Sequence, residues 1–173
     1  GIPKTGVFGL YDLIGIDLMA DVLKSFIKEL SENDPFQIVA KEIPLISKLI
    51  QTGYTGRKGK GGFYRMNKQN NQKILEAISL ETGEYSSTKK IDLGIDTVNL
   101  NLLINRKDKY GEYAWSVISQ IIKYASSLVP SITDKFNDID EAMRLGFNWA
   151  MGPFEMLKSI GVKNFFDRID SYE

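Results

Sequence analysis

Apolar residues recur at helical spacing towards both ends of this 173-residue chain, and this periodicity limits the available folds more than any other feature. Within residues 7–30 the apolar side chains form two successive stripes, and Gly15 lies between them. Such stripes indicate amphipathic helices that each bury one face, and the glycine indicates a break between two helices. Comparable stripes occupy residues 43–50 and 113–125. The sequence therefore predicts a mainly α-helical protein.

The middle of the chain has a different pattern. Short runs typical of β-strands occupy Phe63–Met66, Ile74–Leu80 and Glu84–Ser86, and polar or glycine-containing turns separate them. We interpret this segment as either a small β-ribbon or a partly ordered linker between two helical parts.

Several helix ends can be predicted from single residues. Pro35 suits the first turn of a helix, and Pro130 marks a break. A further helix is expected to begin at Asp138, because acidic side chains in a first turn complement the helix dipole. Gly146 is expected to close that helix, and Pro153 or Phe154 to start the next one.

Two segments of the chain echo each other. Residues 1–16 and 147–162 both contain Gly-x-Phe, then apolar residues at helical spacing, then an apolar residue followed by glycine. Two helix hairpins that share the same turn chemistry would explain the echo, and so would a duplicated helical unit. Duplication requires a helix pair before each copy, and the first copy begins too abruptly to have one. We therefore expect the chain to be truncated within its first repeat.

Composition excludes several classes of function. Lysine plus arginine and aspartate plus glutamate both number 22, so no global field favours nucleic acid or an anionic membrane. No apolar run reaches the roughly 20 residues of a membrane span. Histidine and cysteine are absent, which excludes a Ser-His-Asp triad, a thiol nucleophile and an imidazole base, and removes the ligands that zinc prefers. We expect no metal site, and the lack of cysteine fits a cytoplasmic protein.

Three stretches, in order along the chain, resemble one known family. The first is the Pro-x-x-Gly-Val-Phe-Gly-Leu-x-Asp-x-x-Gly of Pro3–Gly15, and the second is the Gly-Arg-Lys-x-x-x-Gly-Phe-Tyr of Gly56–Tyr64. The third runs from Asp138 to Glu155 and ends in Met-Gly-Pro-Phe-Glu. Together they resemble the C-terminal helical domains of the 3-hydroxyacyl-CoA dehydrogenase family, in its long, two-unit form that serves fatty acid oxidation.

The resemblance implies a fold and a domain organisation. The fold is expected to be mainly α, with helical domains like the C-terminal domain of 6-phosphogluconate dehydrogenase and a short β-hairpin or linker in the middle. Residues 1–66 would be a truncated first helical unit, residues 67–104 the hairpin and linker, and residues 105–173 a second helical unit.

The resemblance also implies a function for the parent enzyme. Such an enzyme is an oxidoreductase that uses NAD to oxidise (S)-3-hydroxyacyl-CoA to 3-ketoacyl-CoA. Its histidine–glutamate pair belongs to an N-terminal NAD-binding domain, so we expect no catalytic residue in this chain, no NAD bound to it alone and no activity. Its expected partners are the acyl-CoA substrate, that missing domain and a second copy of the chain, which could pair through exposed apolar faces.

Individual residues can be assigned expected roles in the same way. The resemblance places Lys58 near bound NAD in the intact enzyme, and the alternative is a solvated basic turn whose glycines serve backbone freedom. In the isolated chain we expect Lys58 to be exposed. Pro3, Gly6 and Phe8 resemble the wall of the acyl-CoA cleft, although core packing is an alternative role for Phe8. Asp12 matches the family aspartate and is expected to cap or pair locally.

The second unit is expected to be a structural copy without chemistry. By the family spacing, the position of the catalytic asparagine falls on Trp115, whereas Asn105-Arg106 is out of register. Lys158 replaces the family aspartate.

Three other interpretations remain open. Asp138 and Asp140 could suggest a metal site, but their loop lacks the glycine and the distal glutamate of an EF-hand, which favours a helix start. The basic residues 57–60 could suggest a nucleic-acid site, against which the zero net charge argues. The alternative to a dehydrogenase fragment is a non-enzymatic helical interaction module that kept the fold.

Overall fold

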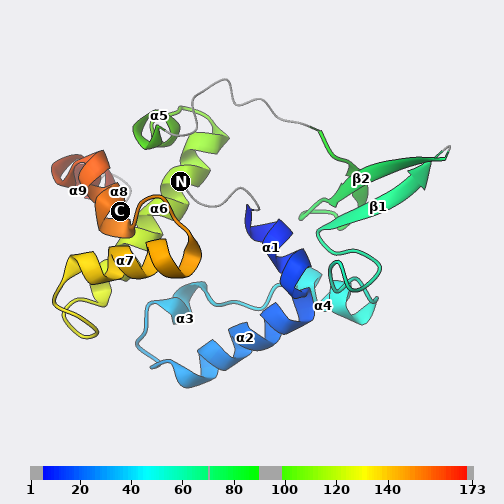
Figure 1. The fold of residues 1–173 in the computed structure, drawn as a ribbon, viewed down its shortest axis with the longest axis horizontal. Coiled ribbons are helices and arrows are strands. Elements are labelled where there is room, and N and C mark those ends of the chain that lie inside the picture. Colours follow the sequence, from blue (N-terminus) through cyan, green and yellow to red (C-terminus); the bar gives the residue numbers. More distant parts are fainter. Residues whose placement is uncertain (1–5, 70, 90–98, 171–173) are drawn as a thin grey trace. The chain divides into compact units, whose positions relative to one another are not determined.

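The computed structural model describes residues 6–69, 71–89 and 99–170 of the chain (Figure 1). The chain divides into two compact units, an N-terminal unit of Lys4–Ile91 and a C-terminal unit that begins at Asp92. Each unit has its own cluster of buried apolar side chains. The expected cleft residue Pro3 lies outside the described residues.

The N-terminal unit begins with four helices. They are α1 (Gly6–Ile14), α2 (Ile16–Glu29), α3 (Phe36–Val39) and α4 (Pro44–Gln51). The break predicted at Gly15 is confirmed: Gly15 has a φ of 117°, which side-chain-bearing residues rarely adopt, and it separates α1 from α2. Pro35 directly precedes α3, in agreement with the expected helix start.

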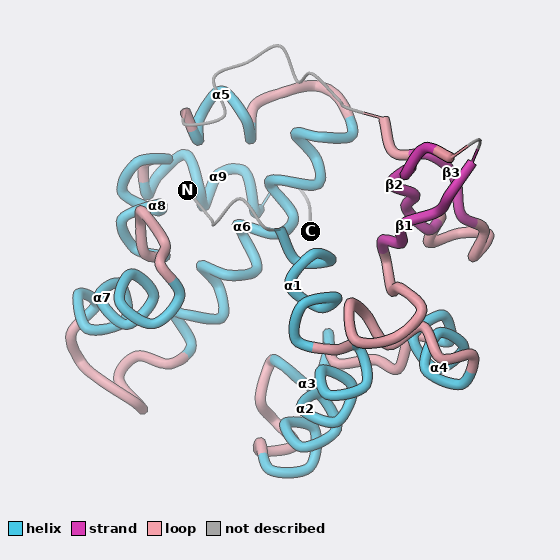
Figure 2. Tube along the Cα trace, turned by 45° about the vertical axis from the view of Figure 1, so that its right-hand side comes forward, coloured by secondary structure: helices cyan, strands magenta, loops and turns pink. Residues whose placement is uncertain are grey.

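A three-stranded antiparallel sheet follows the helices. Its strands β1 (Tyr64–Gln69), β2 (Gln72–Ile78) and β3 (Tyr85–Ser87) pair in sequence order. Figure 2 shows the strands in magenta. The β-ribbon interpretation is therefore confirmed for this part of the chain, with strand ends that differ from the prediction by one to three residues.

The sheet and the helices of the N-terminal unit share one core. Ile16, Leu49 and Phe63 are its buried members, and Ile78 of β2 packs against them. Because Phe63 directly precedes β1, this burial ties the sheet to α2 and α4. Contacts within the chain accordingly group the sheet with the first four helices.

The C-terminal unit is entirely helical in its described part. Its helices are α5 (Leu100–Ile104), α6 (Lys109–Ser127), α7 (Phe136–Phe147), α8 (Pro153–Ile160) and α9 (Val162–Asp170). The long helix α6 is the centre on which α5 and α8 pack, while α7 and α9 contact α8 (Figure 1). The helix α5 occupies the end of the segment predicted as hairpin and linker, where Asn99 caps it by accepting a hydrogen bond from the Leu102 N–H.

Three predicted helix ends in this unit differ from the structure. The helix α7 begins at Phe136, two residues before the start predicted at Asp138, so Asp138 lies within its first turn. The helix α6 begins four residues before Tyr113, because the Asp108 carboxylate accepts hydrogen bonds from the N–H groups of Tyr110 and Gly111. Gly146 does not close α7, which continues to Phe147 and ends where Asn148 adopts a left-handed conformation, with φ 54°. Asparagine tolerates this conformation better than most residues, so it can end a helix as glycine does. The helix start predicted at Pro153 or Phe154 is confirmed, since α8 begins at Pro153.

The echo between the two ends of the chain is also visible in the backbone. Gly161 lies between α8 and α9 with φ 90°, as Gly15 lies between α1 and α2. In both places the glycine N–H donates to the carbonyl four residues earlier, at 2.8 and 2.9 Å, and its own carbonyl accepts from the residue four later, at 3.0 Å. The helix–glycine–helix element is therefore repeated at a constant offset of 146 residues.

Candidate functional site

The carboxylate of Asp12 joins two of the sequence motifs. Asp12 lies on α1 and is 3% exposed, and its two oxygens accept hydrogen bonds of 2.8 Å each from the N–H groups of Phe63 and Tyr64. Its carbonyl also accepts from the Arg57 N–H at 2.8 Å. The expectation of a local cap is wrong, because these partners lie 45 to 52 residues further along the chain, in a loop that folds back onto α1.

The glycines of the Gly56–Gly62 loop allow this close approach. A Cβ atom at Gly62 would overlap the Asp12 carboxylate, and one at Gly56 would overlap the Asp12 carbonyl. Gly56 also has a φ of 101°, and its N–H donates to the Gly61 carbonyl at 2.8 Å to close the loop. These two glycines thus serve contact between loop and helix, which their spacing in the sequence does not reveal.

Lys58 reaches from the same loop to α2. Its ammonium group bonds the Asp17 carboxylate at 2.8 Å, and the two side chains are 53% and 38% exposed. This hydrogen bond is the main reason that the pKa of Asp17 is lowered. The residue just before the loop also contacts the break between α1 and α2, because the Ile16 N–H donates a hydrogen bond to the Thr55 carbonyl at 3.1 Å. Lys58 is therefore half-exposed as expected, but the structure adds an ionic partner.

The two described cleft candidates lie at the start of α1. Gly6 is its first residue, with φ 68°. Phe8 is 37% exposed and its ring centroid lies 4.7 Å from that of the buried Phe63. Phe8 thus contacts the core cluster while leaving part of its ring free, and its role in an acyl-CoA cleft stays a prediction.

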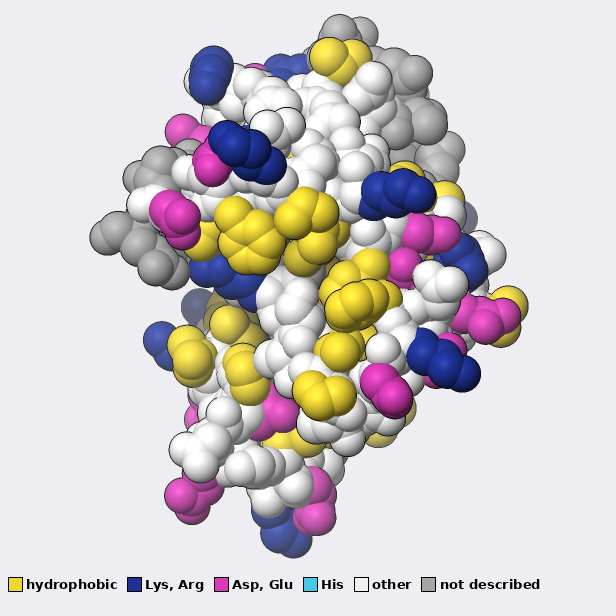
Figure 3. Space-filling model, turned by 90° about the vertical axis from the view of Figure 1, so that its left-hand side faces the viewer, with side chains coloured by type: hydrophobic (Ala, Val, Ile, Leu, Met, Phe, Trp, Pro, Cys, Tyr) yellow, Lys and Arg dark blue, Asp and Glu magenta, His cyan; other side chains and the backbone are white. Residues whose placement is uncertain are grey.

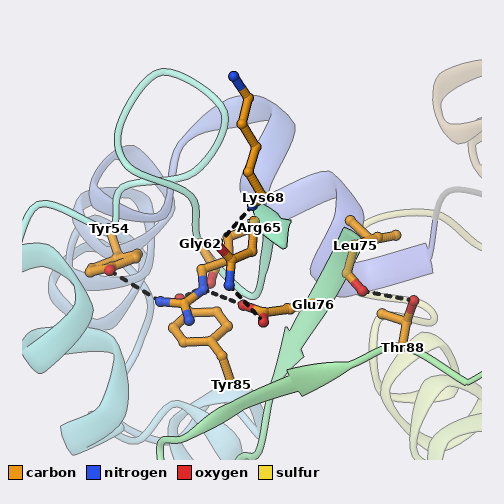
Figure 4. A network of polar contacts seen from close by, with 9 residues as sticks. Tyr54, Gly62, Arg65, Lys68, Leu75, Glu76, Tyr85 and Thr88 are labelled. Carbon is orange, nitrogen blue, oxygen red and sulfur yellow. Dashed lines mark hydrogen bonds and ion pairs between the residues drawn. The ribbon is translucent and has the colours of Figure 1, made fainter. Parts of the chain in front are cut away.

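A polar network on one face of the sheet was not expected from the sequence. Glu76 of β2 is 6% exposed and accepts hydrogen bonds from Arg65 at 2.7 Å and from Asn67 at 3.0 Å (Figure 4). These bonds, that of Asn67 foremost, lower the pKa of Glu76. Arg65 also donates to the Tyr54 hydroxyl at 3.3 Å. Arg65 and Asn67 are two residues apart in β1, and residues at this spacing in a strand share a face. This spacing was the sequence signal from which the network could have been predicted.

Tyr85 connects this network to the loop. The Arg65 guanidinium lies 3.9 Å from the centre of the Tyr85 ring, and the Tyr85 hydroxyl donates to the Gly62 carbonyl at 2.5 Å (Figure 4). Tyr85 of the sheet thereby bonds the Gly56–Gly62 loop at Gly62, while the Asp12 carbonyl bonds it at Arg57. The polar side chains of this network have one another as partners, which indicates a structural role.

Burial raises the pKa of Tyr85 to about 12, and this gives a testable result. The ordinary pKa of tyrosine is 10.0, so the pKa of Tyr85 is higher in the folded than in the unfolded protein. The contribution of this difference to the free energy of unfolding is fully present below about pH 10 and is lost as the pH rises through 12. We expect the difference in tyrosinate absorbance between the wild type and Tyr85→Phe to show a transition near pH 12. A difference transition near pH 10 would contradict the buried position.

A pocket of about 790 Å³ lies beside the loop in the N-terminal unit. Arg57 and Lys60 contribute positive charge to its wall, while Met66 and Leu75, paired in adjacent strands, contribute an exposed apolar surface. Such a wall suits a ligand that carries both an apolar part and a negative charge.

In the C-terminal unit, the candidate polar residues form hydrogen bonds at or near the ends of its helices. Asp140 is buried and accepts a 2.8 Å hydrogen bond from the Phe154 N–H at the start of α8. Burial raises its pKa. Asp138 accepts from the Thr133 hydroxyl, and the Asn105 amide donates to the Asn101 carbonyl. No group of three possible metal ligands occurs in the described part of the chain.

Comparison with known proteins decides the family. The family model described as "3-hydroxyacyl-CoA dehydrogenase, C-terminal domain" matches residues 1–66 and 113–171. The chain belongs to the 3-hydroxyacyl-CoA dehydrogenase family. The resemblance found in the sequence is thereby confirmed, as is the mainly helical fold with its small sheet.

Named relatives agree with this family. The chain is 43% identical over 157 residues to a "Putative fatty acid oxidation complex trifunctional enzyme" of Rickettsia felis, covering 91% of the chain and 22% of that protein. A protein of the same name from Rickettsia prowazekii is 40% identical, covering 98% and 23%. A "Probable 3-hydroxyacyl-CoA dehydrogenase" of Bacillus subtilis is 28% identical, covering 98% and 22%. The chain thus spans under a quarter of the length of these relatives. No solved structure matches it significantly.

Within this dehydrogenase family chain, two family motifs meet. The first motif contains Asp12 and the second is the Gly56–Tyr64 segment, and the Asp12 carboxylate accepts hydrogen bonds from the backbone of the second motif.

Among the described residues, no helix combines the length and apolar character that membrane crossing requires.

Proposed function

We propose that this chain supplies the C-terminal helical part of a 3-hydroxyacyl-CoA dehydrogenase, which uses NAD to oxidise (S)-3-hydroxyacyl-CoA to 3-ketoacyl-CoA in fatty acid oxidation. The chain would contribute walls of the substrate cleft and packing surfaces, while an NAD-binding domain contributes the catalytic pair. On its own the chain would be inactive. Residues 1–66 would form the first helical unit, residues 67–104 the hairpin and linker, and residues 105–173 the second helical unit. The protein would work in the cytoplasm, in keeping with its lack of cysteine.

The observation that carries this proposal is the clamp between Asp12 and the Gly56–Tyr64 loop. The clamp fixes the loop on α1 through two hydrogen bonds to a buried carboxylate, and it thereby holds Lys58 at the junction of α1 and α2. A rigid loop that presents a half-exposed cation can contribute one positive charge to a binding surface completed by another domain. The pyrophosphate of NAD is a suitable anion for such a contact.

The fit to NAD is limited to this contact. The described residues contain helices and a three-stranded antiparallel sheet, but no parallel βαβ unit of the kind that binds dinucleotides. When bound, NAD accepts the hydride in the proposed reaction. This chain's own part is to place the Lys58 ammonium group, which the Asp17 carboxylate orients at 2.8 Å.

The acyl-CoA substrate also suits the surfaces near α1. Gly6 and Phe8 lie at the start of this helix, and Gly9 lines the neighbouring pocket, whose wall combines Arg57 and Lys60 with apolar side chains. An acyl-CoA carries both an apolar chain and phosphates, so it matches this combination of surfaces.

A domain exchange tests the proposed function. In the full-length Rickettsia felis relative, the aligned region would be replaced by this chain, and NADH formation from NAD and (S)-3-hydroxybutyryl-CoA would be measured. We expect the hybrid enzyme to be active within about tenfold of the parent, and the isolated chain to form no NADH. Turnover by the isolated chain, or a folded hybrid without activity, would overturn the proposal.

The hybrid enzyme also tests Lys58. Replacing Lys58 with methionine removes one charge-assisted contact of about 1.5 kcal/mol, so we expect the KM for NAD to rise about tenfold while kcat changes little. Lys24→Met is a matched control, because Lys24 is a surface lysine on α2 that pairs with Asp21. An unchanged KM for NAD in Lys58→Met would assign Lys58 to the ion pair with Asp17 alone.

A further inference from the structure

The pocket beside the Gly56–Gly62 loop has one cation without a partner among the described residues. Arg57 lines the pocket and is exposed, and in the part of the chain that the structure describes its guanidinium forms neither a hydrogen bond nor an ion pair. Its backbone N–H, by contrast, is fixed on the Asp12 carbonyl at 2.8 Å. The side chain therefore starts from an anchored point of the backbone, and its N–H donors remain available to another molecule.

The other charged groups of the pocket wall have partners within the chain. The Asp12 carboxylate accepts two backbone hydrogen bonds, and Arg65 binds Glu76. The Lys60 ammonium group donates to the Thr52 carbonyl at 3.1 Å and keeps its positive charge, because a carbonyl is neutral. One free guanidinium thus remains for a ligand. Its planar fork matches the two oxygens of a carboxylate, which carries a single negative charge.

One position of the pocket wall carries a carboxylate in the other copy of the internal repeat. At the offset of 146 residues, the counterpart of Gly9 in the pocket wall is Glu155. The Glu155 carboxylate accepts a hydrogen bond from the Gly152 N–H at 2.8 Å and pairs with Arg144 in the C-terminal unit. Glycine at position 9 has no such negative charge. The pocket wall is therefore more favourable to an anion than the corresponding place in the second copy.

The sheet contributes an apolar strip to the same pocket. Met66 of β1 and Leu75 of β2 are paired directly across the two strands and are 60% and 44% exposed. Tyr64 lies two residues before Met66, on the same face of β1, and is 38% exposed. The pocket has a volume of about 790 Å³, within the range of roughly 300–1,000 Å³ that is typical of small-molecule sites. A hydrocarbon chain that covered this strip would remove its apolar surface from water, which is favourable.

We propose that this pocket binds a long-chain carboxylate, with the carboxylate on the Arg57 guanidinium and the hydrocarbon chain along the apolar strip. The ligand needs one negative charge and one apolar chain, and neither NAD nor a second domain takes part. It differs from the proposed substrate, because an acyl-CoA has a thioester in place of the carboxylate and carries several charges on the phosphates of CoA. The inference therefore goes beyond the proposed function and does not depend on it.

Methionine methyl resonances can locate the ligand in the unmodified chain. The chain has five methionines, and among them Met66 lines the pocket. We expect dodecanoate, added below its micelle concentration, to shift the Met66 methyl signal with a Kd of about 100 µM and to leave the other four unchanged. A local signal is required because exposed hydrophobic side chains also lie between charged ones on the face shown in Figure 3, where a long chain can adsorb. Met66→Leu assigns the signal, and an unshifted Met66 signal in the folded chain would overturn the proposal.

Three further ligands separate the roles of the chain and the charge. Dodecyltrimethylammonium has the same hydrocarbon chain with a positive head group, acetate has the carboxylate without the chain, and CoA has the phosphates without an acyl chain. We expect each to bind the pocket at least about tenfold more weakly than dodecanoate. Equal affinity for the cationic ligand would show adsorption of hydrocarbon alone, and equal affinity for acetate or CoA would show an anion site without an apolar part. Any of these results would contradict the proposal.

Two pairs of variants test the residues of the pocket. Arg57→Met should raise the Kd for dodecanoate about tenfold, whereas Lys24→Met, at a surface lysine on α2, should leave it unchanged. Leu75→Ser should raise the Kd about fivefold, whereas Leu80→Ser, at a 58% exposed leucine outside the pocket, should have no effect. Circular dichroism checks that each variant is folded, and Arg57→Met decides alone where Leu75→Ser is not. An unchanged Kd in folded Arg57→Met would overturn the proposal. None of these measurements uses enzymatic activity, so their failure leaves the dehydrogenase assignment untouched.

Discussion

Replacing Asp12 with alanine is expected to lower the free energy of unfolding of the N-terminal unit by about 3 kcal/mol. The carboxylate is 3% exposed and accepts two hydrogen bonds of 2.8 Å, from the N–H groups of Phe63 and Tyr64. Alanine would leave both N–H groups without an acceptor, and the Phe63 N–H is buried. Urea denaturation followed by circular dichroism measures the loss, and hydrogen exchange of residues 56–66 shows where it occurs.

Two variants separate the clamp from general effects of removing a carboxylate. Asp12→Asn keeps one acceptor oxygen. Its free energy of unfolding should therefore lie between that of the wild type and that of Asp12→Ala. Asp21→Ala removes an aspartate whose side chain is 75% exposed, on α2 of the same unit, and should cost under about 0.5 kcal/mol. If Asp12→Ala were no more destabilising than Asp21→Ala, the clamp would not hold the loop.

The helices could be predicted from the sequence because their signals are local. Apolar periodicity located the stripes, and Gly15, Pro35 and Pro153 marked breaks or starts through the backbone geometry of single residues. The helix end at Asn148 was missed because asparagine enters the left-handed conformation less often than glycine, so Gly146, two residues earlier, was the stronger candidate.

The candidate site was harder to predict, because its contacts join distant parts of the chain. Asp12 and Phe63 are 51 residues apart, and no periodicity links them. The motif match placed both residues in family segments but did not show that one binds the other. The ion pair between Lys58 and Asp17 was missed for the same reason, since it depends on how the loop crosses the break at Gly15. Close packing, rather than local propensity, determines these pairs.

Replacing Trp115 with alanine is expected to be the most damaging single change in the C-terminal unit, at about 4 kcal/mol. Trp115 is 5% exposed at the centre of the unit's core, and its ring lies 5.5 Å from that of Phe165. Arg168 belongs to α9, and its guanidinium lies 4.1 Å from the centre of the Trp115 ring. The lost free energy of unfolding therefore includes a cation–π contact as well as the cavity that alanine leaves. Thermal unfolding followed by circular dichroism measures the loss.

The same position tests whether the second unit is a structural copy. By the family spacing, Trp115 stands where a catalytic asparagine is expected, yet its side chain belongs to a packed core. We expect Trp115→Asn to destabilise the unit at least as much as Trp115→Ala, because the buried amide gains no apolar contact and must find hydrogen-bond partners. Tyr113→Ala, two residues earlier on α6 and 66% exposed, is the matched control and should cost about 0.5 kcal/mol. A free energy of unfolding of Trp115→Asn within about 1 kcal/mol of the wild-type value would require a polar and accessible position. Such a position could hold a catalytic residue, and this result would contradict the interpretation of the second unit as a structural copy.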